Sequence, residues 1–346
     1  MISVSVAMAT CNGQKYIQRQ LDSLAAQSQA PRELVISDDR SADDTLSIVD
    51  AFAKTASFPV NIHRNEVQLG YRANFLRAAS LCQSELIAFC DQDDHWYPQK
   101  IAVSVEPFSD PEVLLAYHNA DVVTDDGRRI GTLAARAAPQ RVMKPLSLGP
   151  FWPYALGFTE VFRRSLLPLN DLWPKSRDQN DLSQPIAHDQ WFFFLASVFG
   201  RIAYFHEPLA DYMQHGDNTH GWRKPGNRVK ERFRDRSDEY SYYAKAAESR
   251  AVVLELARGK VDGIWVDRAV AATEYYRKVS WLLTERNMLY TSEQLSDRFK
   301  AFRAVLGEGG YTGTWGLGRK SLIADICLGV LVGHFLRSGG QPKGRP

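Results

Sequence analysis

Apolar and polar positions follow two different rhythms along the chain up to about Phe108. Short apolar runs, each of strand length, occur at residues 2–8, 34–37, 60–63 and 86–90. The stretches between these runs place apolar residues at helical spacing, as at Ile17, Leu21 and Leu24. Strands that alternate with helices build a parallel sheet through right-handed crossovers, so this pattern predicts an α/β fold.

Polar residues between the runs predict where the helices begin. Ser41 is a good N-cap for a helix that carries Val49 and Phe52 on one face. A turn at Gly70 leads to a further helix, which we expect over residues 74–80.

Beyond Phe108 the rhythm changes toward antiparallel or mixed strands. Residues 114–117 and 121–123 are apolar runs on either side of a polar turn, and the sequence Asp-Asp-Gly at 125–127 is typical of a hairpin turn. Residues 136–153 are rich in Ala, Pro and Gly, which predicts a long loop. We expect a helix over residues 190–199 and a strand over 202–205.

The composition shifts again after Gly221. A basic stretch over residues 223–236 precedes three or four helical segments, so we expect an α/β domain over residues 1–222 and a basic linker with a helical extension over 223–346. Residues 322–336 are apolar but contain Asp325 and His334, and they are shorter than the roughly 20 residues of a membrane span. They predict either an interfacial helix or a helix that packs against a core or partner.

The overall composition is that of a globular protein. The 346 residues are 45% apolar and 24% charged, and a net charge of +2 argues against a nucleic-acid partner. The four cysteines have no CxxC spacing, and Cys90 lies inside an apolar run, so we expect free thiols in a reducing compartment. The chain enters its first strand without a signal-type segment, which predicts a cytoplasmic protein.

Three carboxylates stand where the apolar run 86–90 ends, at Asp91, Asp93 and Asp94. Ligands of open α/β sheets bind outside the carboxyl ends of the strands, so these acids are expected at a binding crevice. Clustered carboxylates repel one another, and a hard cation such as Mg²⁺ or Mn²⁺ relieves the repulsion while it binds substrate phosphates. The alternative is an acidic loop at the N-terminus of a helix near Pro98.

A second pair of acids, Asp38 and Asp39, ends another strand at the same edge of the predicted sheet. These carboxylates could accept hydrogen bonds from a nucleotide base or ribose, although an Asp-Asp-Arg-Ser sequence is also good turn chemistry. No strong phosphate loop competes for a nucleotide, because the nearest match has Arg319 in the place of the required lysine.

Taken in order, these pieces resemble the nucleotide-sugar-dependent glycosyltransferases of family 2. The matching segments are residues 4–13, residues 38–45, Arg64-Asn65 with Leu69-Gly70, and Asp91-Gln92-Asp93-Asp94 with Trp96. The resemblance implies the GT-A fold, a mixed and mostly parallel sheet flanked by helices, here with a C-terminal helical extension. It is nearest to the rhamnosyltransferase-like bacterial members that build surface polysaccharides.

The resemblance also implies roles for individual residues. The nucleotide would be bound by Thr10, Asn12, Asp39, Asn65 and Asp91. Mg²⁺ or Mn²⁺ would be bound by Asp93 and Asp91, with Asp94 and His215 as further ligands. The wall of the donor or acceptor pocket would include Trp96, His188 and Trp191. Asp189, in the segment His-Asp-Gln-Trp, would be the catalytic base. A role for Asp189 as a helix N-cap or first-turn acid and ordinary surface hydrogen bonding by His215 remain the alternatives.

These roles together imply an inverting glycosyltransferase. It would move a sugar from a dTDP-rhamnose-like or UDP-sugar donor to a saccharide or lipid-linked saccharide acceptor. Two alternatives stay open, a sugar-phosphate nucleotidyltransferase and a noncatalytic sugar-nucleotide-binding protein. The basic and C-terminal segments could contact anionic lipid, which would place the protein at the cytoplasmic face of the inner membrane.

Overall fold

The structure, a computed structural model, describes residues 2–134, 141–151, 155–216, 237–312 and 318–332. The chain divides into two compact units. One unit comprises Met1–Leu148, Trp152–Asp171 and Ala187–Lys224, and the other comprises Gly149–Phe151, Leu172–Ile186 and Pro225–Pro346. The predicted boundary at residues 222 and 223 and the basic stretch 223–236 lie outside the described residues.

The first unit is built on a mixed sheet whose main path has the order β3-β2-β1-β4-β9-β6-β10-β5. Its strands are β1 (Val4–Thr10), β2 (Glu33–Asp38), β3 (Val60–Arg64), β4 (Leu86–Cys90), β5 (His95–Trp96), β6 (Val113–Thr124), β9 (Glu160–Arg163) and β10 (Arg201–Gln214). Strands β1 to β4 are parallel, whereas β9 runs antiparallel to both β4 and β6. Two further strands, β7 (Arg129–Thr132) and β8 (Arg141–Met143), pair with β6 and β10. The predicted α/β fold with a mostly parallel sheet is confirmed.

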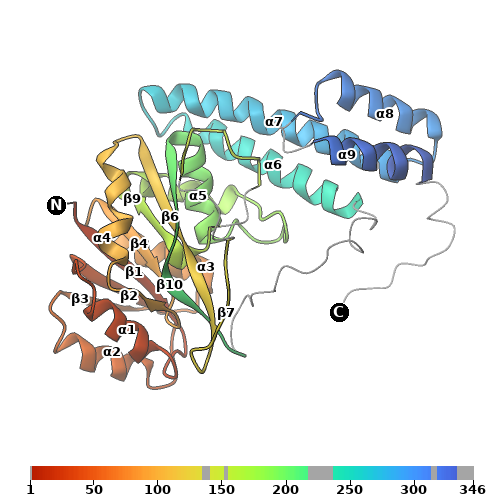
Figure 1. The fold of residues 1–346 in the computed structure, drawn as a ribbon. Coiled ribbons are helices and arrows are strands. Elements are labelled where there is room, and N and C mark those ends of the chain that lie inside the picture. Colours follow the sequence, from red (N-terminus) through yellow and green to blue (C-terminus); the bar gives the residue numbers. More distant parts are fainter. Residues whose placement is uncertain (1, 135–140, 152–154, 217–236, 313–317, 333–346) are drawn as a thin grey trace. The chain divides into compact units, whose positions relative to one another are not determined.

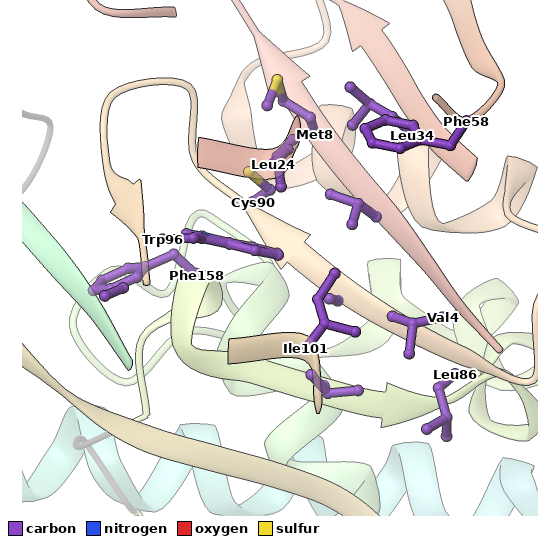
Figure 2. Close-up of a cluster of buried hydrophobic side chains, with 14 of the residues drawn as sticks. Val4, Met8, Leu24, Leu34, Phe58, Leu86, Cys90, Trp96, Ile101 and Phe158 are labelled. Atoms are coloured by element: carbon purple, nitrogen blue, oxygen red, sulfur yellow. The ribbon is translucent and has the colours of Figure 1, made fainter. Parts of the chain in front are cut away.

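Helices cover both faces of this sheet (Figure 1). On one face lie α1 (Ile17–Ala25), α2 (Thr45–Ala53) and α4 (Lys100–Ser104), whose apolar side chains join those of β1 and β4 in one core. Figure 2 shows part of this core, including the side chains of Met8, Leu24, Cys90 and Trp96. The other face carries α3 (Tyr71–Leu81) and α5 (His188–Phe199). Short 3₁₀ segments lie at Glu106–Ser109, Gly157–Thr159 and Arg164–Lys175.

Three expectations from the sequence differ from the structure. The two apolar runs after residue 113 form one strand, β6, because the polar residues between them are buried and Asn119 satisfies its amide within the fold. Helix α2 begins at Thr45, and Ser41 does not cap it, because the Ser41 hydroxyl donates to Asp38 instead. The expected loop 136–153 contains β8, while residues 136–140 and 152–153 lie outside the described residues.

The second unit is mainly helical, as the predicted C-terminal extension required. Its helices are α6 (Ser237–Ala257), α7 (Ile264–Thr291), α8 (Leu295–Gly307), α9 (Arg319–Ala324) and a π-helical segment, η6 (Asp325–Val332). The carboxylate of Asp325, which is fully buried, accepts two hydrogen bonds from Arg286, at 2.7 and 2.9 Å, and therefore ties η6 to α7. Among the helices that the structure describes, none is long and apolar enough to cross a membrane.

The carboxylate of Asp38 joins the loops at the carboxyl ends of the strands. It accepts hydrogen bonds from the Thr10 hydroxyl at 3.0 Å, and from the backbone N–H and the hydroxyl of Ser41 at 3.0 and 2.5 Å. Asp38 is fully buried. Its carboxylate therefore joins the end of β1 to the loop after β2 inside the protein.

We expect Asp38→Ala to lower the free energy of unfolding by about 2–4 kcal/mol, because three buried donors lose their acceptor. Urea denaturation measures this loss. The matched control is Asp44→Ala, since Asp44 is exposed in the same loop and makes no side-chain capping bond. Equal stabilities of the two variants would contradict the structural role of Asp38.

Candidate active site

A pocket of about 170 Å³ lies where β4 ends and α5 begins. Its lining includes four predicted site residues, Asp91, Asp93, His188 and Asp189, together with the aromatic side chains of Tyr71, Phe75, Phe158 and Tyr212. Asp91 and Asp93 follow β4 directly. They therefore lie at the carboxyl end of a parallel strand, where α/β sheets bind their ligands. A larger hollow of about 730 Å³, beside Glu85 and Arg163, has none of the predicted residues in its lining.

Asp189 comes to this pocket from a distant part of the chain. Helix α5 starts at His188, and its N-cap residue is Ala187, so Asp189 is a first-turn residue and not the cap. Its carboxylate accepts a hydrogen bond from the backbone N–H of Gln190 at 2.7 Å and is partly exposed. The helix therefore presents a carboxylate to the same space as Asp91 and Asp93.

The electrostatics of this pocket are unfavourable for an ionised Asp91. Burial, followed by the negative charges of Asp93 and Asp189, raises the pKa of Asp91 to about 8. Burial also raises the pKa of Asp94, with Asp93 and Asp91 as further causes. The cluster is thus a place where a cation would be stabilised, because it would offset the repulsion between the carboxylates.

The other two predicted metal ligands, Asp94 and His215, lie outside the pocket lining. Asp94 is buried outside the pocket lining, and its carboxylate accepts a hydrogen bond from the backbone N–H of Met213 at 3.1 Å. His215 stacks on Tyr16, with ring centres 4.0 Å apart, and its Nε2 lies 2.9 Å from a carboxylate oxygen of Asp93. The structure therefore places His215 beside Asp93 but directs Asp94 into the protein.

Within the described residues, no group of three His, Cys, Asp or Glu side chains is placed to hold a metal ion. Two carboxylates, Asp91 and Asp93, do line the pocket together. Mg²⁺ is often bound in this way, through one or two carboxylates, with substrate phosphates and water as the remaining ligands. The pair fits a divalent cation that arrives with a diphosphate, whereas an all-protein metal cage is not what these residues form.

The predicted nucleotide residues gather at the neighbouring strand ends. The carboxylate of Asp39 accepts hydrogen bonds from the side-chain amide of Asn65 at 2.9 Å and from the backbone N–H groups of Leu69 and Gly70 at 2.7 and 2.8 Å. The backbone N–H of Asn12 donates to the hydroxyl of Ser41 at 2.9 Å. These bonds join the loops after β1, β2 and β3 into one rim.

Gln92 attaches the acid cluster to that rim. Its side-chain amide exchanges two hydrogen bonds with the backbone of Cys11, at 3.0 and 3.1 Å. Gly13 is needed at this contact, because a Cβ atom there would lie 2.3 Å from the amide oxygen of Gln92. The residue between the predicted acids is thus a structural clamp.

Comparison with known proteins supports the family resemblance of the sequence motifs. Residues 5–168 match the sequence model of Glycosyl transferase family 2. Residues 5–168 therefore form a glycosyltransferase family 2 domain. The family resemblance of its motifs is confirmed.

Individual relatives of this chain are distant. It is 27% identical over 219 residues to the uncharacterized protein Rv1520 of Mycobacterium tuberculosis, a match that covers 61% of this chain and 59% of that relative. It is 26% identical over 227 residues to the dTDP-rhamnosyl transferase RfbG of Shigella flexneri, covering 62% and 73% of the two chains. The chain thus spans under two thirds of the mycobacterial relative.

A solved structure shows the same fold. The crystal structure of Staphylococcus aureus TarS 1–349 in complex with UDP has a TM-score of 0.53 and 18% sequence identity to this chain. The match covers 90% of this chain and 93% of that one. The GT-A fold expected from the motifs is confirmed by this likeness, which shows the fold alone.

Two of the predicted pocket residues lie in the protein core. Trp96 is 1% exposed, and Trp191 is fully buried with its indole N–H donated to Asn170 at 2.9 Å. Neither lines the pocket, because Trp96 belongs to the apolar core and Trp191 is a buried residue of α5. The sequence alone does not show whether such an apolar residue lines a pocket or lies in the core.

His188 does line the pocket, inside an aromatic cage. Its ring stacks on Phe75, with centres 3.9 Å apart, and meets Phe89 edge to face at 4.9 Å. Neither ring nitrogen has a hydrogen-bond partner among the residues described. Burial, with a contribution from the charge of Arg72, lowers the pKa of His188 to about 3, so the ring is neutral at physiological pH.

Two buried charged residues near the site were missed by the sequence analysis. Lys100 is fully buried in α4, and burial lowers its pKa to about 7 against the opposing effect of Cys90, Asp94 and Asp91. Glu160, at the start of β9, is also fully buried, and burial together with the charge of Asp189 raises its pKa. The sequence offered one signal for Lys100, which is a basic residue in the first turn of the helix that follows the acid cluster.

The neutral state of His188 predicts a pH-dependent loss of stability. As the pH falls, the His188 ring is protonated below about pH 6.5 in the unfolded chain, but only near pH 3 in the folded protein. The free energy of unfolding therefore decreases between about pH 6.5 and pH 3, by up to about 1.4 kcal/mol per pH unit. Unfolding free energies at pH 4.5 and 7 should differ less in His188→Phe than in the wild type. The exposed His206→Phe is the control. Parallel losses in the wild type and in His188→Phe would contradict the prediction.

Proposed function

We propose that the protein is an inverting glycosyltransferase that moves a sugar from a nucleoside-diphosphate donor to a hydroxyl of a saccharide or lipid-linked saccharide. One observation supports this most strongly. The pair Asp91 and Asp93 lines the same 170 Å³ pocket as Asp189, although Asp189 comes from a different part of the chain. Ligand pockets of about 300–1,000 Å³ hold drug-sized molecules, so this smaller space suits one sugar ring at the reacting centre.

Asp189 is our candidate for the catalytic base. Its carboxylate would take the proton of the acceptor hydroxyl as that oxygen forms its bond to the anomeric carbon. The bond from the anomeric carbon to the diphosphate oxygen breaks on the opposite side, and the nucleoside diphosphate leaves with the electron pair. A single displacement of this kind inverts the anomeric centre and needs only one base.

Asp91 and Asp93 are our candidates for holding Mg²⁺ or Mn²⁺ against the diphosphate of the donor. Such a cation, when bound, neutralises the charge that develops on the leaving group. The raised pKa of Asp91, which burial and the charges of Asp93 and Asp189 cause, supports this assignment, because a cation would stabilise the ionised carboxylate. His215, beside Asp93, would orient that carboxylate through its 2.9 Å contact.

The rim formed by the loops after β1, β2 and β3 is our candidate for the nucleotide site. The side chains of Thr10 and Asp39 are buried and already hydrogen-bonded within the rim, so their part would be to shape the backbone around the base and ribose. Asn12 and Asn65 would complete the rim. A dTDP-rhamnose-like or UDP-sugar donor is supported by the names of relatives, a dTDP-rhamnosyl transferase and a TarS chain crystallised with UDP.

The match to family 2 argues against the nucleotidyltransferase alternative. We place the reaction in bacterial surface polysaccharide synthesis in the cytoplasm. Residues 223–346 would then be an extension that brings the catalytic domain, residues 1–222, to the cytoplasmic face of the inner membrane. Exposed apolar side chains on α8, at Leu295, Phe299 and Leu306, support such a peripheral contact.

A panel of nucleotide sugars with Mg²⁺ or Mn²⁺ tests the proposed activity, with thermal shift to find the donor and nucleoside-diphosphate release to detect transfer. We expect one donor to raise the melting temperature only when the cation is present. Asp93→Asn should abolish this cation-dependent shift, because the pocket loses one of its two metal carboxylates. Absence of turnover across the panel, with an unchanged shift in Asp93→Asn, would overturn the proposal.

The base is tested separately. We expect Asp189→Asn to lower kcat by about 10²–10⁴-fold while the dissociation constant of the donor stays the same, because the amide keeps the shape of the side chain but accepts no proton. Asp22→Asn, at an exposed position on α1, is the control and should behave as the wild type. A wild-type kcat in Asp189→Asn would show that another group takes the proton.

A further inference from the structure

Tyr71, the first residue of α3, is the most exposed of the Phe and Tyr side chains that line the pocket. It is 36% exposed, whereas Phe75 is 4% and Phe158 is 1% exposed. Tyr212 is intermediate. The ring of Tyr71 therefore stands at the mouth of the pocket, where it faces both the pocket and the solvent.

The neighbours of Tyr71 hold its ring in place. The Tyr71 hydroxyl accepts a hydrogen bond from Nε of Arg72 at 3.0 Å, and the guanidinium carbon of Arg72 lies 5.5 Å from the ring centre. The ring also meets His188 edge to face, with ring centres 6.2 Å apart and planes 82° apart. A tyrosine has only two side-chain torsions to fix, so a ring that is already held binds a ligand at a small entropy cost.

The backbone that carries Tyr71 belongs to the rim. Gly70 precedes the helix with a φ of 78°, a conformation that residues with a side chain rarely adopt. The carboxylate of Asp39 accepts hydrogen bonds from the backbone N–H groups of Leu69 and Gly70. The start of α3, and with it Tyr71, is therefore fixed to the loops that we assign to the nucleotide.

The volume of the pocket leaves a place for Tyr71 in the proposed reaction. Two sugars meet at the reacting centre, one from the donor and one in the acceptor, but a space of about 170 Å³ suits a single ring. Part of the other sugar then lies against the mouth. One face of a sugar ring consists largely of C–H groups, which are attracted to the negatively charged face of an aromatic ring. The exposed ring of Tyr71 supplies such a face.

We propose that Tyr71 is a specificity-determining residue whose ring makes a stacking contact with a sugar at the mouth of the pocket. The inference rests on the glycosyltransferase function proposed above. Donor and acceptor sugars offer the same chemistry, a ring with a C–H face, and kinetic constants distinguish these two sources. The contact selects sugars by shape, because an axial hydroxyl on the stacking face holds the sugar away from the aromatic ring.

Two substitutions separate the ring of Tyr71 from its hydroxyl. Tyr71→Leu removes the aromatic face and keeps an apolar side chain, whereas Tyr71→Phe removes only the hydroxyl. Tyr242→Leu, at a 44% exposed position on α6, is the matched control. The probes are the nucleotide sugar that the wild type turns over, its nucleoside diphosphate (UDP or dTDP), and the methyl glycosides of rhamnose, glucose and N-acetylglucosamine as acceptors.

We expect Tyr71→Leu to lower kcat/KM by about 5- to 30-fold, while Tyr71→Phe stays within about 3-fold of the wild type and Tyr242→Leu matches it. A higher KM for the methyl glycoside with an unchanged donor dissociation constant assigns the contact to the acceptor. A higher dissociation constant of the donor assigns it to the donor sugar. In both cases the dissociation constant of UDP or dTDP alone should not change, because these nucleotides carry no transferable sugar.

Wild-type kinetics in a folded Tyr71→Leu would overturn the assignment. Weaker binding of UDP or dTDP by this variant would also overturn it, because the loss would then come from the rim. An equal loss in Tyr71→Phe would show that the hydroxyl matters and not the ring face. A wild-type protein that releases no nucleoside diphosphate from any donor of the panel would contradict the proposed function itself, and that failure is visible before any variant is made.

Discussion

Repulsion between carboxylates at the end of β4 is the interaction on which the arrangement of this site depends. Asp91, Asp93 and Asp94 follow one another within a single turn of chain, and Asp189 adds a fourth negative group from α5. Each acid is handled differently by its surroundings. Asp94 turns inward to a backbone N–H, Asp93 meets His215, and Asp91 keeps a raised pKa. The site thus holds acidic groups whose ionised forms a bound cation would stabilise.

The loops around this charge are held by hydrogen bonds between strand ends and not by apolar packing. Asp38 joins the loops after β1 and β2, Asp39 joins those after β2 and β3, and Gln92 ties the acid cluster to the loop after β1. Each of these side chains satisfies several donors or acceptors at once. A rim built in this way is rigid before a ligand arrives, which lowers the entropy cost of binding.

The sequence predicted the features that rest on local pattern. Apolar runs placed β1 to β4, and their abrupt polar ends placed the carboxylates at the correct edge of the sheet. The family motif led to Asp189, which no periodicity could have connected to Asp91. Ser41 was predicted as a helix cap because its preference for a cap is local, whereas the buried Asp38 that claims its hydroxyl is a tertiary neighbour.

Features that depend on three-dimensional packing could not be predicted. Trp96 and Trp191 are aromatic residues of the type that can line a sugar-binding pocket. Only the packed sheet and helices show that both rings are in the core. Lys100 looked like an ordinary polar residue in a helix, because its neighbours Phe158 and Asp94 are brought to it by the fold. Whether a charged side chain is buried depends on the residues that pack against it in the fold, and the sequence pattern does not show which residues these are.

In the mechanism we propose, a single base, Asp189, would face a metal-bound diphosphate across one sugar-sized pocket. The anomeric configuration of the product, determined by nuclear magnetic resonance for the donor that is turned over, tests this mechanism. A single displacement gives a new linkage with the configuration opposite to that of the donor. A product with the donor's own configuration would contradict it, because retention requires a second displacement that this arrangement of carboxylates does not explain.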